Sequence, residues 1–311
     1  MKKTTSTDIS DRFWNLPQKA GEELSRERTY IDDIIQKSHI ERLLLENLNG
    51  ICTAFDGGAG YGRFSLLLAA RGVHVTHFDI SLPMLEKARE LADERKVAQN
   101  MTFVHGSLED LSAFANKQFD LAMSFDAPIS YTYPKHETVI KSLLRIAGKK
   151  LCIGVYSRLA WTYLFDPAQK LKYIYNKDTR DPFARWTLDH AANQLVDFKP
   201  DMAAVREFFK TGLMEKTEDT AAEYEKGNTP WPVSYTFMPD ELTGILENAG
   251  AKNIKLSGPG ALSRSIPGEV LSNIMWDKQL SREFLDFCYW YDSQPQCVGI
   301  GKDNLVVIAE L

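Results

Sequence analysis

The sequence predicts an α/β fold in which a mostly parallel sheet carries helices on both faces. From residue 51, short apolar runs alternate with segments of helical period, and this alternation is typical of such sheets. A cluster of glycines stands where the first of these strands turns into a helix. The alternation stops after Tyr156, where an aromatic-rich segment begins, and resumes near Pro239. This break predicts a core that is interrupted by an insert.

The first 50 residues are expected to form an N-terminal helical extension. Residues 1–28 are polar, and Tyr30–Leu48 then has apolar residues mostly at three- and four-residue spacing. Asn49 and Gly50 are typical of a helix end. Phe13 and Trp14 interrupt the polar stretch, and the sequence leaves open whether they pack on the core or cover a ligand.

The central part of the chain alternates regularly. Its expected strands are Cys52–Asp56, Val73–Asp79, Thr102–His105, Phe119–Ser124 and Lys150–Tyr156. Its expected helices are Gly62–Arg71, Leu82–Ala98 and His136–Ala147. Ligands bind at the carboxyl ends of the strands in sheets of this kind, so the residues that follow each strand are the first candidates for a site.

Residues 158–236 form the insert, and residues 237–311 return to the core. Helices are expected at Thr187–Phe198 and Asp201–Leu213 within the insert, and afterwards at Pro239–Ala249 and Glu269–Tyr291. The remaining strands are expected at Asn253–Leu256 and Asn304–Glu310. The insert leaves from the ligand-facing end of the fifth strand, which favours a substrate lid. A dimer surface and an added packing layer are the alternatives.

Composition limits the possible classes of protein. The chain has 311 residues, is 44% hydrophobic and carries a net charge of −5. A mildly acidic chain is poorly suited to binding a long nucleic-acid backbone, so DNA is not expected as a partner.

The four cysteines form no CxxC pair, and Cys52 and Cys152 lie in apolar strands, which favours buried thiols over disulfides or zinc. Neither a secretory signal nor a membrane span is recognisable, so a cytoplasmic location is expected.

The glycine cluster lies in Phe55–Ser65, which reads FDGGAGYGRFS. Its spacing is D-x-G-x-G-x-G from Asp56 to Gly62. The dinucleotide fingerprint G-x-G-x-x-G would need a glycine where Arg63 stands. A phosphate-binding loop of the Walker type is excluded, because no Gly-Lys-Ser/Thr follows. Bare backbone at a helix N-terminus nevertheless suits a polar ligand, so a nucleotide-type cofactor is expected.

D-x-G-x-G-x-G after a first strand resembles the signature of class I S-adenosylmethionine-dependent methyltransferases. The second strand ends in HFDIS, with Asp79 placed 19 residues beyond Gly60, where the family has a carboxylate for the ribose. The fourth strand, FDLAMSFD, is also similar to that of the family. After the third strand the family usually has an acid and then an apolar residue, whereas this chain has Ser107-Leu108.

The resemblance implies a Rossmann-like three-layer sandwich with a seven-stranded sheet whose last strand is antiparallel. It implies a core made of residues 51–157 and 237–311, and S-adenosyl-L-methionine as the cofactor. The implied cofactor-binding residues are Asp56, Gly58, Gly60, Tyr61, Gly62, Asp79, Ile80, Ser107, Leu108 and Phe125.

Catalytic candidates follow the fourth strand, in FDAPISYTYPKH. Asp126 could orient an amine or the cofactor, and His136 could be a base because it titrates near neutrality. Tyr131 could line the pocket. The plainer alternatives are a surface position for His136 and ordinary packing for Tyr131. Methyl transfer from a sulfonium can also proceed without a base, because alignment and exclusion of water do most of the work. No pair of histidines has metal-ligand spacing, so no metal is expected.

These observations predict a methyltransferase that acts on an oxygen or nitrogen of a small molecule. The alternatives are a tRNA or protein methyltransferase, suggested by the basic and aromatic residues between Arg158 and Trp186, and a cofactor-binding protein without activity. A nicotinamide dehydrogenase is disfavoured by Arg63. Acidic residues dilute the basic stretch, so RNA ranks below a small substrate. A monomer and a homodimer are both compatible with the sequence.

Overall fold

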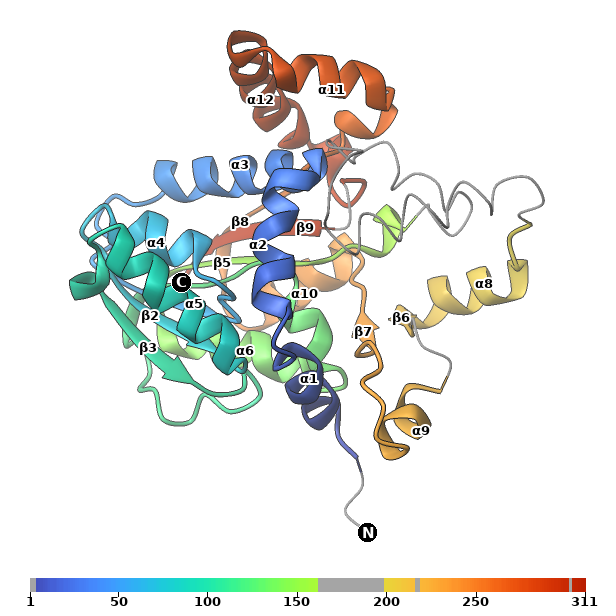
Figure 1. Ribbon diagram of the computed structural model, residues 1–311, viewed down its shortest axis with the longest axis horizontal. Helices are drawn as coiled ribbons and strands as arrows, with labels where there is room; N and C mark the ends of the chain where they lie inside the picture. Colours follow the sequence, from blue (N-terminus) through green and yellow to red (C-terminus); the bar gives the residue numbers. More distant parts are fainter. Residues whose placement is uncertain (1–3, 162–198, 216–218, 302–303) are drawn as a thin grey trace.

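The computed structural model describes residues 4–161, 199–215, 219–301 and 304–311 (Figure 1). A seven-stranded sheet forms its centre, in the order β3-β2-β1-β4-β5-β9-β8. β9 is antiparallel to both of its neighbours, and the other adjacent pairs are parallel. The strands of this sheet are β1 Thr53–Gly57, β2 His74–Asp79, β3 Met101–His105, β4 Phe119–Ser124, β5 Ala147–Tyr156, β8 Lys252–Ser257 and β9 Asn304–Glu310. The predicted Rossmann-like α/β sheet is confirmed.

Helices cover both faces of this sheet, which gives three layers (Figure 1). One face packs against α3 Ile31–Glu46, α4 Arg63–Ala69 and α5 Leu82–Glu94, and the other packs against α6 His136–Ile146 and α10 Pro239–Asn248. β9 is apolar from Leu305 to Ala309 because both of its faces are covered: Leu305 and Val307 belong to one core cluster, and Val306 belongs to the other. Successive side chains of a strand point to opposite faces, so a strand that is covered on both sides has no polar face.

The N-terminal extension is helical from near its start. It forms α1 Ser6–Trp14 and α2 Lys19–Thr29 ahead of α3. Thr5 caps α1 through a reciprocal pair of hydrogen bonds with Asp8. The Thr5 N–H donates to the Asp8 carboxylate, and the Asp8 N–H donates to the Thr5 hydroxyl. Tyr30 is in an extended conformation and separates α2 from α3. The sequence predicted α3 but not the two helices before it, because their polar residues show no apolar period.

The predicted helix Glu269–Tyr291 is wrong in one respect, because it is broken in two. α11 Gly268–Trp276 ends at Asp277, and α12 Lys278–Asp292 begins there. The Asp277 side chain accepts 2.9 Å hydrogen bonds from the main-chain N–H groups of Gln279 and Leu280, so it caps the second helix. The apolar period runs through the break, which is why the sequence pattern did not show it.

The described part of the insert contains α8 Met202–Thr211, β6 Leu213–Met214, α9 Thr220–Glu225 and β7 Ser234–Tyr235. α8 confirms the helix predicted at Asp201–Leu213, whereas the helix predicted at Thr187–Phe198 lies outside the described residues. β6 and β7 pair antiparallel. The chain then rejoins the core at Phe237, which bridges to Ser157 at the end of β5. The division into core and lid stays a prediction.

Short 3-10 turns complete the described structure: η1 Ala98–Asn100, η2 Pro128–Thr132, η3 Arg158–Ala160, η6 Ser263–Ser265 and η7 Pro295–Cys297.

All four cysteines are free thiols. Cys152 is buried as expected, but Cys52 is exposed, because it precedes β1 instead of lying within it. Among the described residues, no helix is both long and apolar enough to cross a membrane.

Candidate active site

A cavity opens at the carboxyl ends of the parallel strands. It is lined by residues that end or follow four of these strands: Asp56, Asp79, Ser107 and Asp126. Tyr156, at the end of β5, extends the lining further across the sheet. Loops at this edge of a sheet converge on one point, so residues that are distant in sequence share one site.

The glycine loop, residues 57–62, connects β1 to α4 and forms one wall of this cavity. Gly58 has a φ of +66°, and a Cβ atom there would overlap the ring of Pro128. Only glycine therefore fits at this position. The main-chain N–H groups of Gly58 and Ala59 both donate to the carbonyl of Phe78, which holds the loop against the end of β2. The main chain of the glycine loop is therefore held in place and faces the cavity without intervening side chains at the glycines.

Asp79 joins this loop to the second strand. Its Oδ2 accepts a 2.8 Å hydrogen bond from the Gly60 N–H, and its Oδ1 accepts one of 2.8 Å from the Ser81 N–H. Burial raises the pKa of the carboxyl, and these main-chain hydrogen bonds oppose that shift. The side chain borders the cavity in a fixed orientation, as a carboxylate that binds a ribose diol requires.

A buried chain of hydrogen bonds supports the glycine loop from below. The Ser65 hydroxyl lies 2.6 Å from Asp56 Oδ2 and 2.9 Å from His77 Nδ1, and His77 Nε2 lies 3.1 Å from the Gly60 carbonyl. A carbonyl only accepts, so Nε2 must carry a proton. The chain is then satisfied in two ways: Asp56 protonated with His77 neutral, or Asp56 ionised with His77 doubly protonated. The pair carries no net charge in either case.

Burial favours the first of these arrangements. It raises the pKa of Asp56 to about 7 and lowers the pKa of His77 to about 4. Between about pH 4 and pH 7 the carboxyl therefore keeps its proton and the imidazole is neutral. Asp56 and Asp79 both border the cavity, but Asp56 reaches the loop through Ser65 and His77, whereas Asp79 accepts directly from the Gly60 N–H.

Asp126 and Ala127 follow β4 with φ of +63° each, which is unusual for residues that carry a side chain. This backbone turns Asp126 toward the cavity, and 47% of its side chain is exposed there. Burial by the surrounding protein raises the pKa of its carboxyl, and Lys37 opposes the shift. A strained backbone beside a cavity is typical of a functional position.

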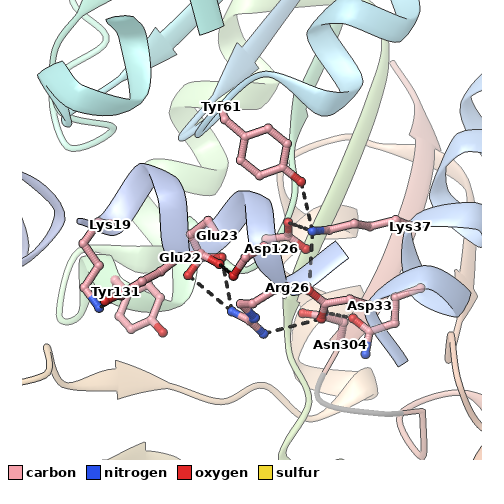
Figure 2. A network of polar contacts seen from close by, with 12 residues as sticks. Lys19, Glu22, Glu23, Arg26, Asp33, Lys37, Tyr61, Asp126, Tyr131 and Asn304 are labelled. Carbon is pink, nitrogen blue, oxygen red and sulfur yellow. Dashed lines mark hydrogen bonds and ion pairs between the residues drawn. The ribbon is translucent and has the colours of Figure 1, made fainter. Parts of the chain in front are cut away.

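A line of alternating charges runs from α2 through α3 to Asp126 (Figure 2). Arg26 lies 3.2 Å from Glu23 and 3.4 Å from Asp33. Lys37 lies 3.5 Å from Asp33 and 3.8 Å from Asp126, and it also donates to the Tyr61 hydroxyl of the glycine loop at 3.1 Å. We call Glu23, Arg26, Asp33, Lys37 and Asp126 the acid–base chain. It carries three carboxylates and two bases, and it starts and ends on a carboxylate.

Four aromatic side chains form another part of the lining. We call Trp14, Tyr131, Tyr156 and Trp231 the aromatic wall. Trp14 and Tyr131 make an edge contact at 5.8 Å between ring centroids, and the hydroxyls of Tyr131 and Tyr156 are 2.7 Å apart. Burial raises the pKa of Tyr131 to about 12, so its phenol is neutral at physiological pH.

The first helix holds parts of the site together. The Ser81 hydroxyl donates to the Trp14 carbonyl at 2.6 Å, and the Leu82 N–H donates to Asn15 Oδ1 at 2.9 Å. On its other side, Arg12 donates to the Tyr224 and Asn228 carbonyls of the insert. α1 therefore connects the β2–α5 turn with the insert above the strand ends.

Most of the residues that the sequence singled out border this cavity. They are Asp56, Gly58, Gly60, Tyr61, Asp79, Ile80, Ser107, Leu108, Phe125, Asp126 and Tyr131. Gly62 is not part of the lining; it begins α4 beside His77 and Ala88. Phe13 is buried, as packing on the core requires, whereas Trp14 borders the cavity, so a role for Trp14 in covering a ligand stays a prediction.

His136 also lies outside the lining, stacked 4.1 Å from the Tyr235 ring and 5.6 Å from the Tyr133 ring. Burial lowers its pKa. It is therefore not the surface residue that the sequence offered as the plainer alternative, and its role as a base stays a prediction.

Other cavity residues were missed by sequence reasoning. Glu23, Arg26 and Asp33 come from the N-terminal helices, and Trp231 comes from the end of the insert. A polar helix face without a motif is indistinguishable from a solvated face in the sequence, so only the fold reveals these residues. In the described part of the chain, no group of three or more His, Cys, Asp or Glu side chains is arranged to hold a metal.

The lining fits S-adenosyl-L-methionine on two observations. The glycine loop is a cradle that a Cβ atom at Gly58 would disrupt, and Asp79 presents an oriented carboxylate beside it. Apolar side chains of Ile80, Met84 and Leu108 border the same cavity, which suits an adenine ring.

Comparison with known proteins agrees with this fit. Residues 54–149 match the model of a methyltransferase domain family. Over 84 residues the chain is 29% identical to the tRNA 5-carboxymethoxyuridine methyltransferase of Escherichia coli K12. That match covers 27% of this chain and 32% of the relative, so the chain spans about a third of this curated protein.

Solved structures were also found. Phosphoethanolamine N-methyltransferase 2 of Haemonchus contortus, in complex with S-adenosyl-L-methionine, matches over 99% of this chain and 60% of its own, with 14% identity and a TM-score of 0.50. A methyltransferase from Thermotoga maritima, described as a possible histamine N-methyltransferase, matches over 97% and 98%, with 15% identity and a TM-score of 0.49. The first likeness concerns the fold alone. The domain match at residues 54–149, the D-x-G-x-G-x-G loop and the strand order together support a class I S-adenosylmethionine-dependent methyltransferase, with S-adenosyl-L-methionine as its cofactor.

Proposed function

We propose that the protein transfers a methyl group to an oxygen or nitrogen atom of a small molecule. The cofactor supplies the methyl group on a positively charged sulfur, which is already an activated leaving group. The observation that supports a small acceptor is the lining around Asp126, to which α1, α2 and the end of the insert all contribute side chains. A space bounded by three separate segments suits a molecule that is enclosed on several sides.

In this proposal the residues divide into two groups. Asp79, the glycine loop and the apolar residues beside them hold the cofactor. Tyr131 and the members of the acid–base chain other than Lys37 border the remaining space, where they orient the acceptor and restrict water. Tyr131 acts as a wall and hydrogen-bonding group, because a phenol with a pKa of about 12 is a poor acid or base at neutral pH. The proposal also keeps a cytoplasmic location and a monomer or homodimer.

The likeness to a tRNA methyltransferase supports tRNA as a second candidate acceptor. One experiment separates the two. Purified protein and isotopically labelled cofactor are incubated with a cell extract divided into a fraction below 1 kDa and an RNA fraction, and labelled products are identified by mass spectrometry. We expect label only in the small-molecule fraction; label in RNA alone would overturn the proposal. S-adenosylhomocysteine binding, measured by calorimetry, is the prior condition for either result.

A further inference from the structure

The acid–base chain leaves an excess of negative charge beside the cavity. Arg26 and Lys37 each lie between two carboxylates, whereas Glu23 and Asp126 each have one basic neighbour within the chain. All members except Lys37 border the cavity. Both positive charges are therefore already engaged, and a bound anion would have to compete with carboxylates for them.

The two end carboxylates affect each other. Burial is the largest cause of the raised pKa of the Asp126 carboxyl; Lys37 and Arg26 oppose the shift, and Asp33 and Glu23 add to it. Glu23 and Asp126 belong to the same network of polar contacts (Figure 2). A cation placed beside both would be attracted by both. Removal of water when the cavity fills would strengthen this attraction, because charges interact more strongly where the surroundings are less polarisable.

The aromatic wall favours the same kind of ligand. Trp14 comes from α1, Tyr131 from η2, Tyr156 from β5, and Trp231 from the insert. Trp14 contacts both Tyr131 and Trp231, with ring centroids 5.8 Å and 6.3 Å apart. The faces of such rings carry partial negative charge and attract organic cations. Aromatic rings beside a chain in which carboxylates outnumber bases are suited to an alkylammonium group.

We propose that the acceptor is an organic amine, recognised as a cation by Glu23, Asp126 and the aromatic wall. The inference rests on the proposed methyl transfer and deepens it. The bound ammonium first loses one proton to solvent by way of the Asp126 carboxylate, which frees its lone pair. The nitrogen then bonds to the methyl carbon as the carbon–sulfur bond breaks and its electron pair stays on sulfur. Positive charge thus moves from sulfur to a nitrogen that the carboxylates already stabilise.

The test uses three small probes that cannot accept a methyl group at nitrogen. Choline is a quaternary ammonium, 3,3-dimethylbutan-1-ol is its neutral isostere, and 3,3-dimethylbutanoate is an anion of similar shape. Binding to protein saturated with S-adenosylhomocysteine is followed by tryptophan fluorescence and by saturation-transfer NMR. We expect choline to bind at least about 10-fold more tightly than the alcohol, and the anion to bind more weakly than either.

Two variants connect this preference to the named carboxylates. Glu23→Gln and Asp126→Asn each remove a charge at nearly constant shape, and asparagine tolerates the positive φ at residue 126. Each should reduce the affinity for choline by about 5- to 10-fold and leave the affinity for the alcohol unchanged. Glu90→Gln is the matched control, because Glu90 is an exposed residue of α5 that pairs with Lys87 and lies outside the cavity lining.

Several results would overturn the inference: equal binding of choline and the alcohol, a preference for the anion, or no binding of any probe at 50 mM. A preference seen only without S-adenosylhomocysteine would also overturn it, because the ammonium of the cofactor itself would then be the cation that these carboxylates bind. Calorimetry on the same samples separates a failure of the proposed function from a failure of this inference alone. Absence of S-adenosylhomocysteine binding contradicts the proposed function, whereas its binding without a cation preference contradicts only this inference.

Discussion

The main-chain N–H of Gly60 donates a 2.8 Å hydrogen bond to Oδ2 of Asp79, which joins the loop after β1 to the end of β2. The Ser81 N–H fixes the other oxygen of the same carboxylate. Asp79 therefore has two functions in the site. It holds the glycine loop in place, and it presents a carboxylate of defined orientation to the cavity.

Asp79→Asn should consequently weaken S-adenosylhomocysteine binding. The variant removes the charge proposed to bind the ribose and places an amide where the Gly60 N–H needs an acceptor. Hydrogen bonds to a charged group contribute about 1.5–3 kcal/mol, so we expect a loss of about 10- to 100-fold in affinity by calorimetry. Asp110→Asn, a change at an exposed carboxylate that bonds only to the nearby Ser112, is the control. Equal affinities of the two variants would contradict the assigned role.

The sequence was sufficient to predict the sheet because its strands are nearly continuous apolar runs with glycines and polar residues at their ends. It was also sufficient to place Asp56 and Asp79, because a motif of fixed spacing follows the first strand and a carboxylate ends the second. These features are local. They can be recognised in one stretch of chain without knowledge of what packs against it.

The acceptor side of the cavity could not be predicted in the same way. Glu23 and Arg26 lie on a helix whose residues look solvated, and only the packing of α2 against the strand ends brings them to Asp126. The surroundings of His136 could not be predicted either. The sequence favoured a surface position at a helix start, but the return of the insert places Tyr235 against its ring. Both outcomes depend on contacts between distant segments.

Gly212 is expected to be essential for the junction between the insert and the core. It ends α8 with a φ of +70°, and a Cβ atom there would overlap the Arg158 guanidinium and lie 2.8 Å from the Thr236 carbonyl. Gly212→Ala should cost about 1–2 kcal/mol from the left-handed backbone and about 1–3 kcal/mol more from the overlap.

Gly227→Ala provides the matched control, because Gly227 has a φ of +88° but no neighbour within 4 Å of an added Cβ atom. It should cost only the backbone contribution. Urea unfolding of both variants measures the difference, and equal losses of stability would show that the Arg158 contact adjusts without strain.

Arg12 should control how often the insert separates from α1. Its guanidinium donates 3.0 Å hydrogen bonds to the Tyr224 and Asn228 carbonyls and lies 3.6 Å from the centre of the Tyr224 ring. Arg12→Ala should make hydrogen exchange in residues 220–236 about 10-fold faster, since a loss of about 1.4 kcal/mol is a tenfold change in the opening equilibrium. Arg71→Ala, which removes one exposed hydrogen bond to Leu67 near the end of α4, should leave that exchange unchanged. Unchanged exchange in both variants would contradict the connection.

The Asp56–His77 pair predicts two opposite dependences of stability on pH. The pKa of Asp56 is raised to about 7 in the folded protein, so its contribution to stability is present at low pH and is lost as the pH rises toward 7. The pKa of His77 is lowered to about 4, so its contribution is present above pH 6.5 and is lost as the pH falls toward 4. In the wild-type protein the two contributions nearly cancel between pH 4.5 and 6.5.

Single variants should uncover each contribution. Asp56→Asn leaves only His77, so its stability relative to wild type should rise with pH, by up to about 1.4 kcal/mol per pH unit. His77→Gln leaves only Asp56, and its relative stability should fall with pH at a similar rate. Urea unfolding at pH 4.5, 5.5 and 6.5 measures both slopes. Opposite slopes would show that, once its partner is removed, each group is held in its neutral form beneath the glycine loop. Parallel profiles for wild type and both variants would show that neither group changes its proton occupancy on folding.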